Sequence, residues 1–380
     1  MAINISFIGD VMLGRVIGRR YGKQSYPIVE QSLREKIIKG ADLVFANLES
    51  PVAYKSQTEG DHLQFRGNPD TLEELKWIDA FTLSNNHITD CGTDGITETI
   101  EILEHKGFKH NGIYNGEYEP FVFEKDGEKI AIIVATDMLN IPFAEDCKWK
   151  TLRVGDKAVM EMIKECHEKE YCVIVYAHIG MLFTRYPNPF TSDYLHECVD
   201  NGADIVVTAH SHCLGGMEEY KGKPIFHSLG DFVMDGNSFR RRQSAALKLD
   251  IEGRSVRSWS IVPAMIDMNY LTVCPDEKTE VKMRKSFDKV TADLKKHTED
   301  YQKFFKTRYK KEMINHTLST LHFLMKQRGV GGMFKMVWMR LEEVKRMFTW
   351  VSKDRSKDRR DDDAIKADRK KFKDEDLFRQ

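Results

Sequence analysis

The stretch ADIVVTAHSH, residues 203–212, joins a short apolar run to two histidines. The run is rich in β-branched residues and is bounded by small and polar ones, which predicts a buried strand. Alternate side chains of an extended chain point the same way, so His210 and His212 can face one site. Neutral imidazole nitrogens are common ligands for zinc, iron and manganese. The segment therefore indicates a strand that ends in metal ligands.

Six further runs share this character, because each is short and apolar and ends in polar or small residues. They are residues 3–10, 41–49, 78–86, 129–137, 171–180 and 223–231. Amphipathic stretches with helical spacing lie between many of them, at residues 33–38, 96–103, 159–166 and 194–199. Strands that alternate with helices predict an α/β layered fold.

Polar side chains of metal-binding type follow these strands at or just past their C-terminal ends. They are Asp10, Glu49, Asn86, His87, His178, His210 and His212. Each one alone is commonly a cap, a turn residue or a solvated strand end, and TLSNNHITDCG (82–92) has the composition of a turn. Ligands collect outside the carboxyl ends of strands in α/β sheets. The shared position of all seven residues therefore favours one metal site.

This order of residues resembles the calcineurin-like metallophosphoesterase superfamily. It is most similar to the CapA branch, the poly-γ-glutamate capsule synthesis proteins. The matching segments lie between about residues 3 and 236, and the specific ones are SNNHITDCGTDG (84–95) and HSH with GKPIFHSLGDF (210–212 and 222–232). The resemblance implies a layered β-sandwich flanked by helices.

The resemblance also implies site residues and two divalent metal ions, Mn, Fe or Zn. It implies that Asp10 and His212 hold one ion, that Asn86, His178 and His210 hold the second, and that Glu49 bridges them. His87 would face the substrate as a general acid or phosphoryl-oxygen donor. Asp90 would either cap the following helix or orient His87 by a hydrogen bond.

Three departures from the superfamily pattern bear on the site. Met12 stands where classical members have histidine, which removes one ligand of the first metal. The tryptophan and acid of a His-Trp-Gly-x-Glu segment are Ile179 and Leu182 here. The asparagine of Ser-Leu-Gly-Asn is Asp231, an extra carboxylate expected to contact the substrate region, where it would tune a proton or repel an anion.

Arginine side chains supply candidate anion contacts, because the guanidinium fork suits phosphate and carboxylate. Arg15, five residues past Asp10, is the expected substrate-binding residue. Arg66 and the run 240–242 are further candidates. For each of them the alternative is a solvated surface charge.

Composition bounds the class of protein. The 380 residues have a formal net charge of -1, so no global field favours nucleic acid or an anionic membrane surface. The seven cysteines have no CxxC spacing, which indicates reduced thiols. No basic segment with a long apolar run opens the chain, and no stretch approaches the ~18 apolar residues of a spanning helix. A cytoplasmic protein is expected.

Three regions are expected along the chain. Residues 1–265 would form the metallophosphoesterase-like domain, 266–351 a helical extension and 352–380 a charged, disordered tail. The segment 333–351 carries Met, Phe and Trp among Lys and Arg, so it would either dock on the first domain or make peripheral membrane contact.

Two functions from different classes remain. The first is a metal-dependent hydrolase of a phosphoester or related bond, with His87 as its acid. The second is a non-catalytic component that binds or assembles an anionic polymer. The expected partner is accordingly a phosphoester or a polyglutamate-like polymer.

Overall fold

The computed structural model describes residues 2–21, 26–58, 64–296 and 300–350, and the side chains among them up to residue 327. One sheet has eight strands in the order β14-β13-β12-β1-β2-β3-β4, with β11 also paired to β1. Its strands are β1 Ile3–Val11, β2 Leu43–Leu48, β3 Ala80–Thr82, β4 Lys109–Asn111, β11 Asp231–Val233, β12 Gln243–Glu252, β13 Ser255–Ile266 and β14 Thr272–Val273.

The second sheet has six strands in the order β5-β6-β7-β8-β10-β9. They are β5 Phe121–Lys125, β6 Glu128–Thr136, β7 Cys172–His178, β8 Ile205–Ala209, β9 Met217–Tyr220 and β10 Lys223–Phe226. The helices are α1 Arg15–Tyr21, α2 Gln31–Ile38, the 3-10 turn η1 Pro69–Leu75, α3 Gly92–His105, α4 Lys157–Glu168, α5 Pro189–Asp200, α6 Glu277–Lys296 and α7 Tyr301–Trp350.

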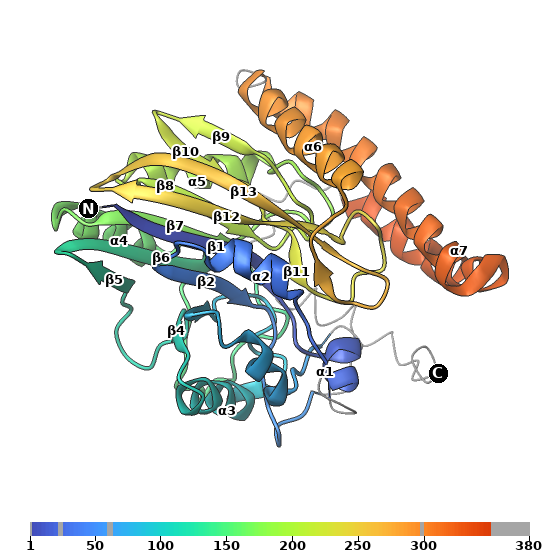
Figure 1. Cartoon of the computed structure of the whole chain (residues 1–380), viewed down its shortest axis with the longest axis horizontal. Coiled ribbons are helices and arrows are strands. Elements are labelled where there is room, and N and C mark those ends of the chain that lie inside the picture. Colours follow the sequence, from blue (N-terminus) through green and yellow to red (C-terminus); the bar gives the residue numbers. More distant parts are fainter. Residues whose placement is uncertain (1, 22–25, 59–63, 297–299, 351–380) are drawn as a thin grey trace.

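The two sheets pack face to face through alternate residues of their strands. Phe7 of β1 contacts Phe45 of β2 in its own sheet and Tyr176 of β7 in the other. The opposite face of the first sheet packs against α2 and α3, and that of the second against α4 and α5 (Figure 1). These four layers confirm the predicted α/β sandwich flanked by helices.

Parallel strands in each sheet bring the predicted strand ends together. β1 pairs with β2 in parallel, with Asp10 opposite Asn47, and β7 pairs with β8, with His178 opposite Ala209. Side chains that follow these strands therefore gather at the same end of the sandwich.

A close approach of two backbone segments fixes the end of β1. A Cβ atom on Gly9 would lie 2.0 Å from the carbonyl oxygen of Gly230, so only glycine fits there. Gly230 itself has a φ of +78°, and its carbonyl accepts from the Asp10 N–H at 3.0 Å. The contact places Asp231 directly opposite Asp10 in the register of β1 and β11.

The helical extension predicted after residue 266 is present as α6 and α7, which run beside each other along one flank of the sandwich (Figure 1). Met283 and Phe287 of α6 belong to the core between the sheets. Glu312 of α7, 3% exposed, forms ion pairs with Arg185 and Arg240. The predictions for the 333–351 side chains and for the 352–380 tail lie outside the described residues.

No helix in the described part of the chain is both long and apolar enough to span a bilayer. The seven cysteines are unpaired, and five of them are buried.

Candidate metal centre

The ends of β1, β2, β7 and β8, with the segment after β3, bring all six expected ligand residues together. One group lies around His178 Nε2, which is 2.8 Å from Asn86 Oδ1, 3.0 Å from His210 Nδ1 and 3.6 Å from Glu49 Oε1. The Asn86 amide nitrogen donates to Asn140 Oδ1 at 3.1 Å, which turns its oxygen toward His178. Two imidazole nitrogens, an amide oxygen and a carboxylate therefore converge on one point.

The second group consists of three carboxylates and one imidazole. Ligand atoms of Asp10, Glu49, His212 and Asp231 all lie within 4.8 Å of one another. His212 Nε2 is 3.9 Å from Glu49 Oε1, while its Nδ1 is 2.7 Å from Asp231 Oδ1. A carboxylate on the far ring nitrogen is the usual way of fixing the orientation of a metal-binding histidine.

Glu49 belongs to both groups, and its surroundings indicate whether the two groups fit metal ions. Its side chain is 0% exposed, and neither Oε1 nor Oε2 has a hydrogen-bond partner among the described residues. An ionised carboxylate that is buried without hydrogen bonds is costly, and a bound cation can offset that cost. The position between two sets of nitrogen and oxygen donors fits a bridging ligand of divalent ions.

The pKa shifts of the buried groups also fit a metal site. Burial and the nearby Asp231 raise the pKa of Asp10 to about 7. Burial, with Asp10 and Asp231 beside it, raises the pKa of Glu49 well above its usual range. Burial and the neighbouring histidines hold the pKa of His178 well below its usual value. The metal-free site thus favours neutral imidazole, the form that binds metals, and holds carboxyl protons that a metal must displace.

Two asparagines that the sequence analysis did not single out hold the ligands in place. Asn47 donates to Asp10 Oδ1 at 2.7 Å, and Asn85 donates to Asn47 Oδ1 at 3.1 Å. Asn85 also accepts from the His87 N–H at 3.0 Å. Both could have been found from their positions next to predicted ligands, because Asn47 lies two residues before Glu49 and Asn85 directly before Asn86.

Left-handed backbone conformations gather around the site. His210 has a φ of +90°, His212 of +57° and Phe183 of +65°, which is unusual for bulky residues. Phe183 is held by a hydrogen bond to the Ser211 carbonyl at 2.8 Å, and its ring stacks on His212 at 6.1 Å and on His316 of α7 at 4.2 Å. Strain of this kind persists where the surrounding structure imposes it, commonly at functional sites.

His87 lies beside the ligands without belonging to either group. Its Nε2 is 3.9 Å from Glu49 Oε1, and its Nδ1 is 2.6 Å from Asp90 Oδ2. Phe65 stacks on the imidazole at 3.9 Å. Cys91 is the N-cap of α3, so of the two roles considered for Asp90 the structure shows the orienting one. The TLSNNHITDCG segment is thus both a turn and part of the site.

The two expected substrate-binding residues differ in placement. Asp231 is 0% exposed within the second ligand group, and its Oδ2 accepts from Arg241 at 3.1 Å. Arg15 forms an ion pair with Asp235, and its guanidinium lies 4.6 Å from the centre of the Phe65 ring. Arg15 therefore contacts the ring that stacks on His87.

Of the three departures from the superfamily pattern, Asp231 belongs to the second ligand group, and the other two lie outside both groups. Met12 is 0% exposed and packs with Phe65, Met234 and Ile266. Ile179 is buried beside α5, while the side chain of Leu182 is exposed.

Comparison with known proteins places the chain in a family. The family described as "Bacterial capsule synthesis protein PGA_cap" matches residues 4–236. The "PGA biosynthesis protein CapA" of Bacillus subtilis is 27% identical over 300 residues, which covers 77% of this chain and 78% of that protein. The "Capsule biosynthesis protein CapA" of Bacillus anthracis is 24% identical over 278 residues, with 70% and 67% covered.

Among solved structures, a putative 5'-nucleotidase from Staphylococcus aureus aligns over 76% of this chain and 58% of that one, with 16% identity and a TM-score of 0.46. A hypothetical protein from Thermus thermophilus aligns over 69% and 98%, with 15% identity and a TM-score of 0.43. The family match spans both ligand groups and every strand end that contributes to them. The expected resemblance to the CapA branch is confirmed, and the chain belongs to the bacterial capsule synthesis protein PGA_cap family.

Proposed function

We propose that this protein is a metal-dependent hydrolase that cleaves a phosphoester bond in the synthesis of a polyglutamate capsule. The observation that carries the proposal is Glu49, a fully buried carboxylate that two groups of ligand atoms share and that accepts no hydrogen bond from the described residues. The setting follows from relatives whose names tie them to PGA and capsule biosynthesis.

Two divalent ions, Mn, Fe or Zn, suit the donor set. Asn86, His178 and His210 would hold one of them, Asp10 and His212 the other, and Glu49 would bridge them. When bound, such ions activate water and neutralise charge on phosphoryl oxygens.

His87 supplies the proton in this proposal. With a proton on Nδ1, the ring donates to Asp90 Oδ2 at 2.6 Å, which fixes its orientation. The ring then directs Nε2 to the side where Glu49 lies, 3.9 Å away. From there an Nε2–H can protonate a leaving oxygen. Phe65 stacks on the ring and restricts its rotation.

The test combines metal analysis with turnover. The purified protein should contain divalent metal by mass spectrometry and hydrolyse bis(p-nitrophenyl) phosphate with added Mn²⁺. His87→Ala should lower kcat by about 10²–10⁴-fold while the metal content stays the same. His105→Ala, which removes an exposed histidine at the end of α3, is the matched control. It should keep the kcat and the metal content of the wild type. Equal kcat in His87→Ala and wild type would contradict the assignment.

In the second candidate function the protein binds metals but hydrolyses no bond. The names of the Bacillus relatives concern the polymer itself, which favours a protein that binds an anionic polymer or its phosphorylated carrier. Bound metal with no turnover of any phosphoester, together with metal-dependent binding of oligo-γ-glutamate, is the outcome that selects this function.

A further inference from the structure

The charge balance of the site leaves room for an anion. Asp10, Glu49 and Asp231 carry three negative charges when ionised, and the Arg241 guanidinium adds one positive charge next to them. Two divalent ions would add four positive charges, which leaves a surplus of about two positive charges. A buried site with this surplus attracts a phosphomonoester or phosphodiester.

Arg241 is placed to contact such an anion. Its Nη2 donates to Asp231 Oδ2 at 3.1 Å, which ties one arm of the fork to the second ligand group. Its Nε is buried and has no hydrogen-bond partner among the described residues. The guanidinium also lies 5.3 Å from the centre of the Phe183 ring, which stacks on His212. One arm is therefore fixed while another donor is unused.

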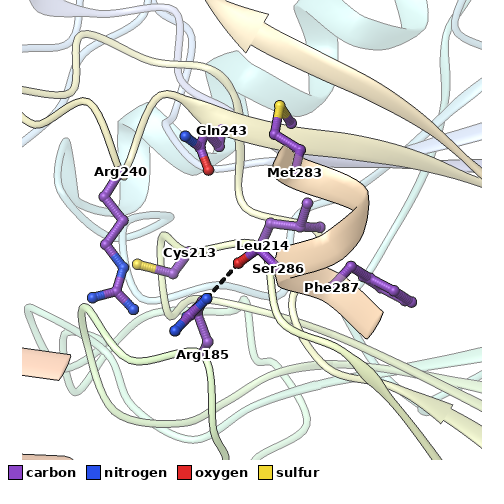
Figure 2. Close-up of a pocket in the computed structure, with 8 residues that line it drawn as sticks. All are labelled: Arg185, Cys213, Leu214, Arg240, Gln243, Met283, Ser286 and Phe287. Atoms are coloured by element: carbon purple, nitrogen blue, oxygen red, sulfur yellow. Dashed lines mark hydrogen bonds between the residues drawn. The ribbon is translucent and has the colours of Figure 1, made fainter. Parts of the chain in front are cut away.

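The neighbouring arginines are committed elsewhere. Arg242 donates to the backbone carbonyls of Gly236, Ile266 and Asp267. Figure 2 shows Arg240 beside Arg185, which donates to Ser286 of α6, and both arginines also bind Glu312. Arg15 is paired with Asp235. Of the run 240–242, Arg241 is the member that contacts a residue of the ligand groups.

We propose that Arg241 is the anion-binding residue of this site and that its unused guanidinium N–H groups donate to a phosphoryl oxygen of the substrate. The assignment rests on the proposed function for the class of substrate. It replaces Arg15, the residue that the sequence favoured for this role. Asp231 then has two tasks, because it orients His212 through Oδ1 and holds Arg241 through Oδ2.

The experiment measures binding and does not need turnover. Inorganic phosphate is titrated into Mn²⁺-loaded protein by calorimetry, with metal content measured in parallel. Arg241→Gln should weaken phosphate binding about 10- to 100-fold, the effect of losing a charge-assisted hydrogen bond, and should keep the metal. Arg241→Lys keeps the positive charge without the guanidinium fork, and its phosphate affinity should lie between those of the wild type and Arg241→Gln. Arg284→Gln removes the same charge from α6, where Arg284 pairs with Glu280, and is the matched control.

Several results would overturn the assignment. Unchanged phosphate affinity in Arg241→Gln, or a loss in Arg15→Gln of equal or greater size, would exclude Arg241. Loss of metal would show that Arg241 only neutralises Asp231. If Arg241→Gln does not fold, Arg241→Lys serves in its place. A phosphate affinity equal to that of the wild type in Arg241→Lys would then exclude Arg241. If Arg241→Gln weakens the binding of glutarate but not of phosphate, the anion that Arg241 binds is a carboxylate and the phosphoryl assignment is wrong. Phosphate binding through Arg241 without hydrolysis would refute the hydrolase and leave this assignment standing.

Discussion

Glu49→Gln should separate the stability of the fold from the stability added by metals. The carboxylate is 0% exposed, has no hydrogen-bond partner among the described residues and is shared by both ligand groups. Because its burial and its acidic neighbours raise its pKa, a neutral amide of the same shape relieves the metal-free site. We expect the metal-free variant to unfold at the same temperature as the wild type or slightly higher.

The expected magnitude follows from ligand linkage. A metal present at 100 times its Kd adds about 2.7 kcal/mol to the free energy of unfolding, so two ions add about 5 kcal/mol. At roughly 2.1 cal/mol/K per residue, the entropy of unfolding of 380 residues is about 0.8 kcal/mol/K. Metal should therefore raise the Tm of the wild type by about 6 °C. If the substitution weakens both sites 100-fold, about 0.4 kcal/mol per site remains, or about 1 °C in total.

The assay is thermal unfolding of both proteins with Mn²⁺ and with a chelator. Asp204→Asn is the matched control, because Asp204 is also buried but is neutralised by Lys223 and Arg254. It should lower the Tm in both conditions and keep the metal-dependent increase. A full metal-dependent increase in Glu49→Gln would refute the bridging role and with it the two-metal interpretation.

Three further outcomes are expected. Burial raises the pKa of Asp10 to about 7 and that of Glu49 well above its usual range, so below pH 7 a metal must displace protons from both; calorimetric Mn²⁺ affinity should fall by about tenfold or more as pH decreases from 7 to 6, and a flat profile contradicts this. Asp90→Asn should lower kcat about 10²-fold or more at unchanged metal content, because the His87 ring loses the acceptor that fixes it; equal kcat would remove Asp90 from the mechanism. Glu312→Gln leaves two largely buried arginines without their anion and should lower the free energy of unfolding in urea by about 3 kcal/mol, against less than about 0.5 kcal/mol for Glu280→Gln at a partly exposed ion pair.

The sequence predicted the strands that carry ligands because each is a short apolar run that ends in a polar residue. Residues 203–212 became β8 followed by His210 and His212, and residues 171–180 became β7, which ends at His178. The pairing order of the sheets was not predictable, since it depends on contacts between residues far apart in the chain.

The parts of the site that the sequence did not predict depend on contacts between distant loops. Asn47 lies in the predicted strand 41–49 and Arg241 in the arginine run 240–242, but the fold determines that they bind Asp10 and Asp231. Arg15 was favoured for its nearness to Asp10 in sequence, and Asp235, 220 residues away, pairs with it instead. Spacing along a chain identifies which residues end strands and leaves open which partner each side chain meets.

Glu312 has a consequence for how this protein is shortened in the laboratory. The family match ends at residue 236, yet the guanidinium groups of Arg185 and Arg240, on either side of that boundary, take their counter-charge from a helix that begins at Tyr301. A fragment cut at the family boundary would retain Arg185 without its anion and would also lose strands β12 and β13. We therefore expect a stably folded fragment to extend at least through Glu312, past the region by which its relatives are recognised.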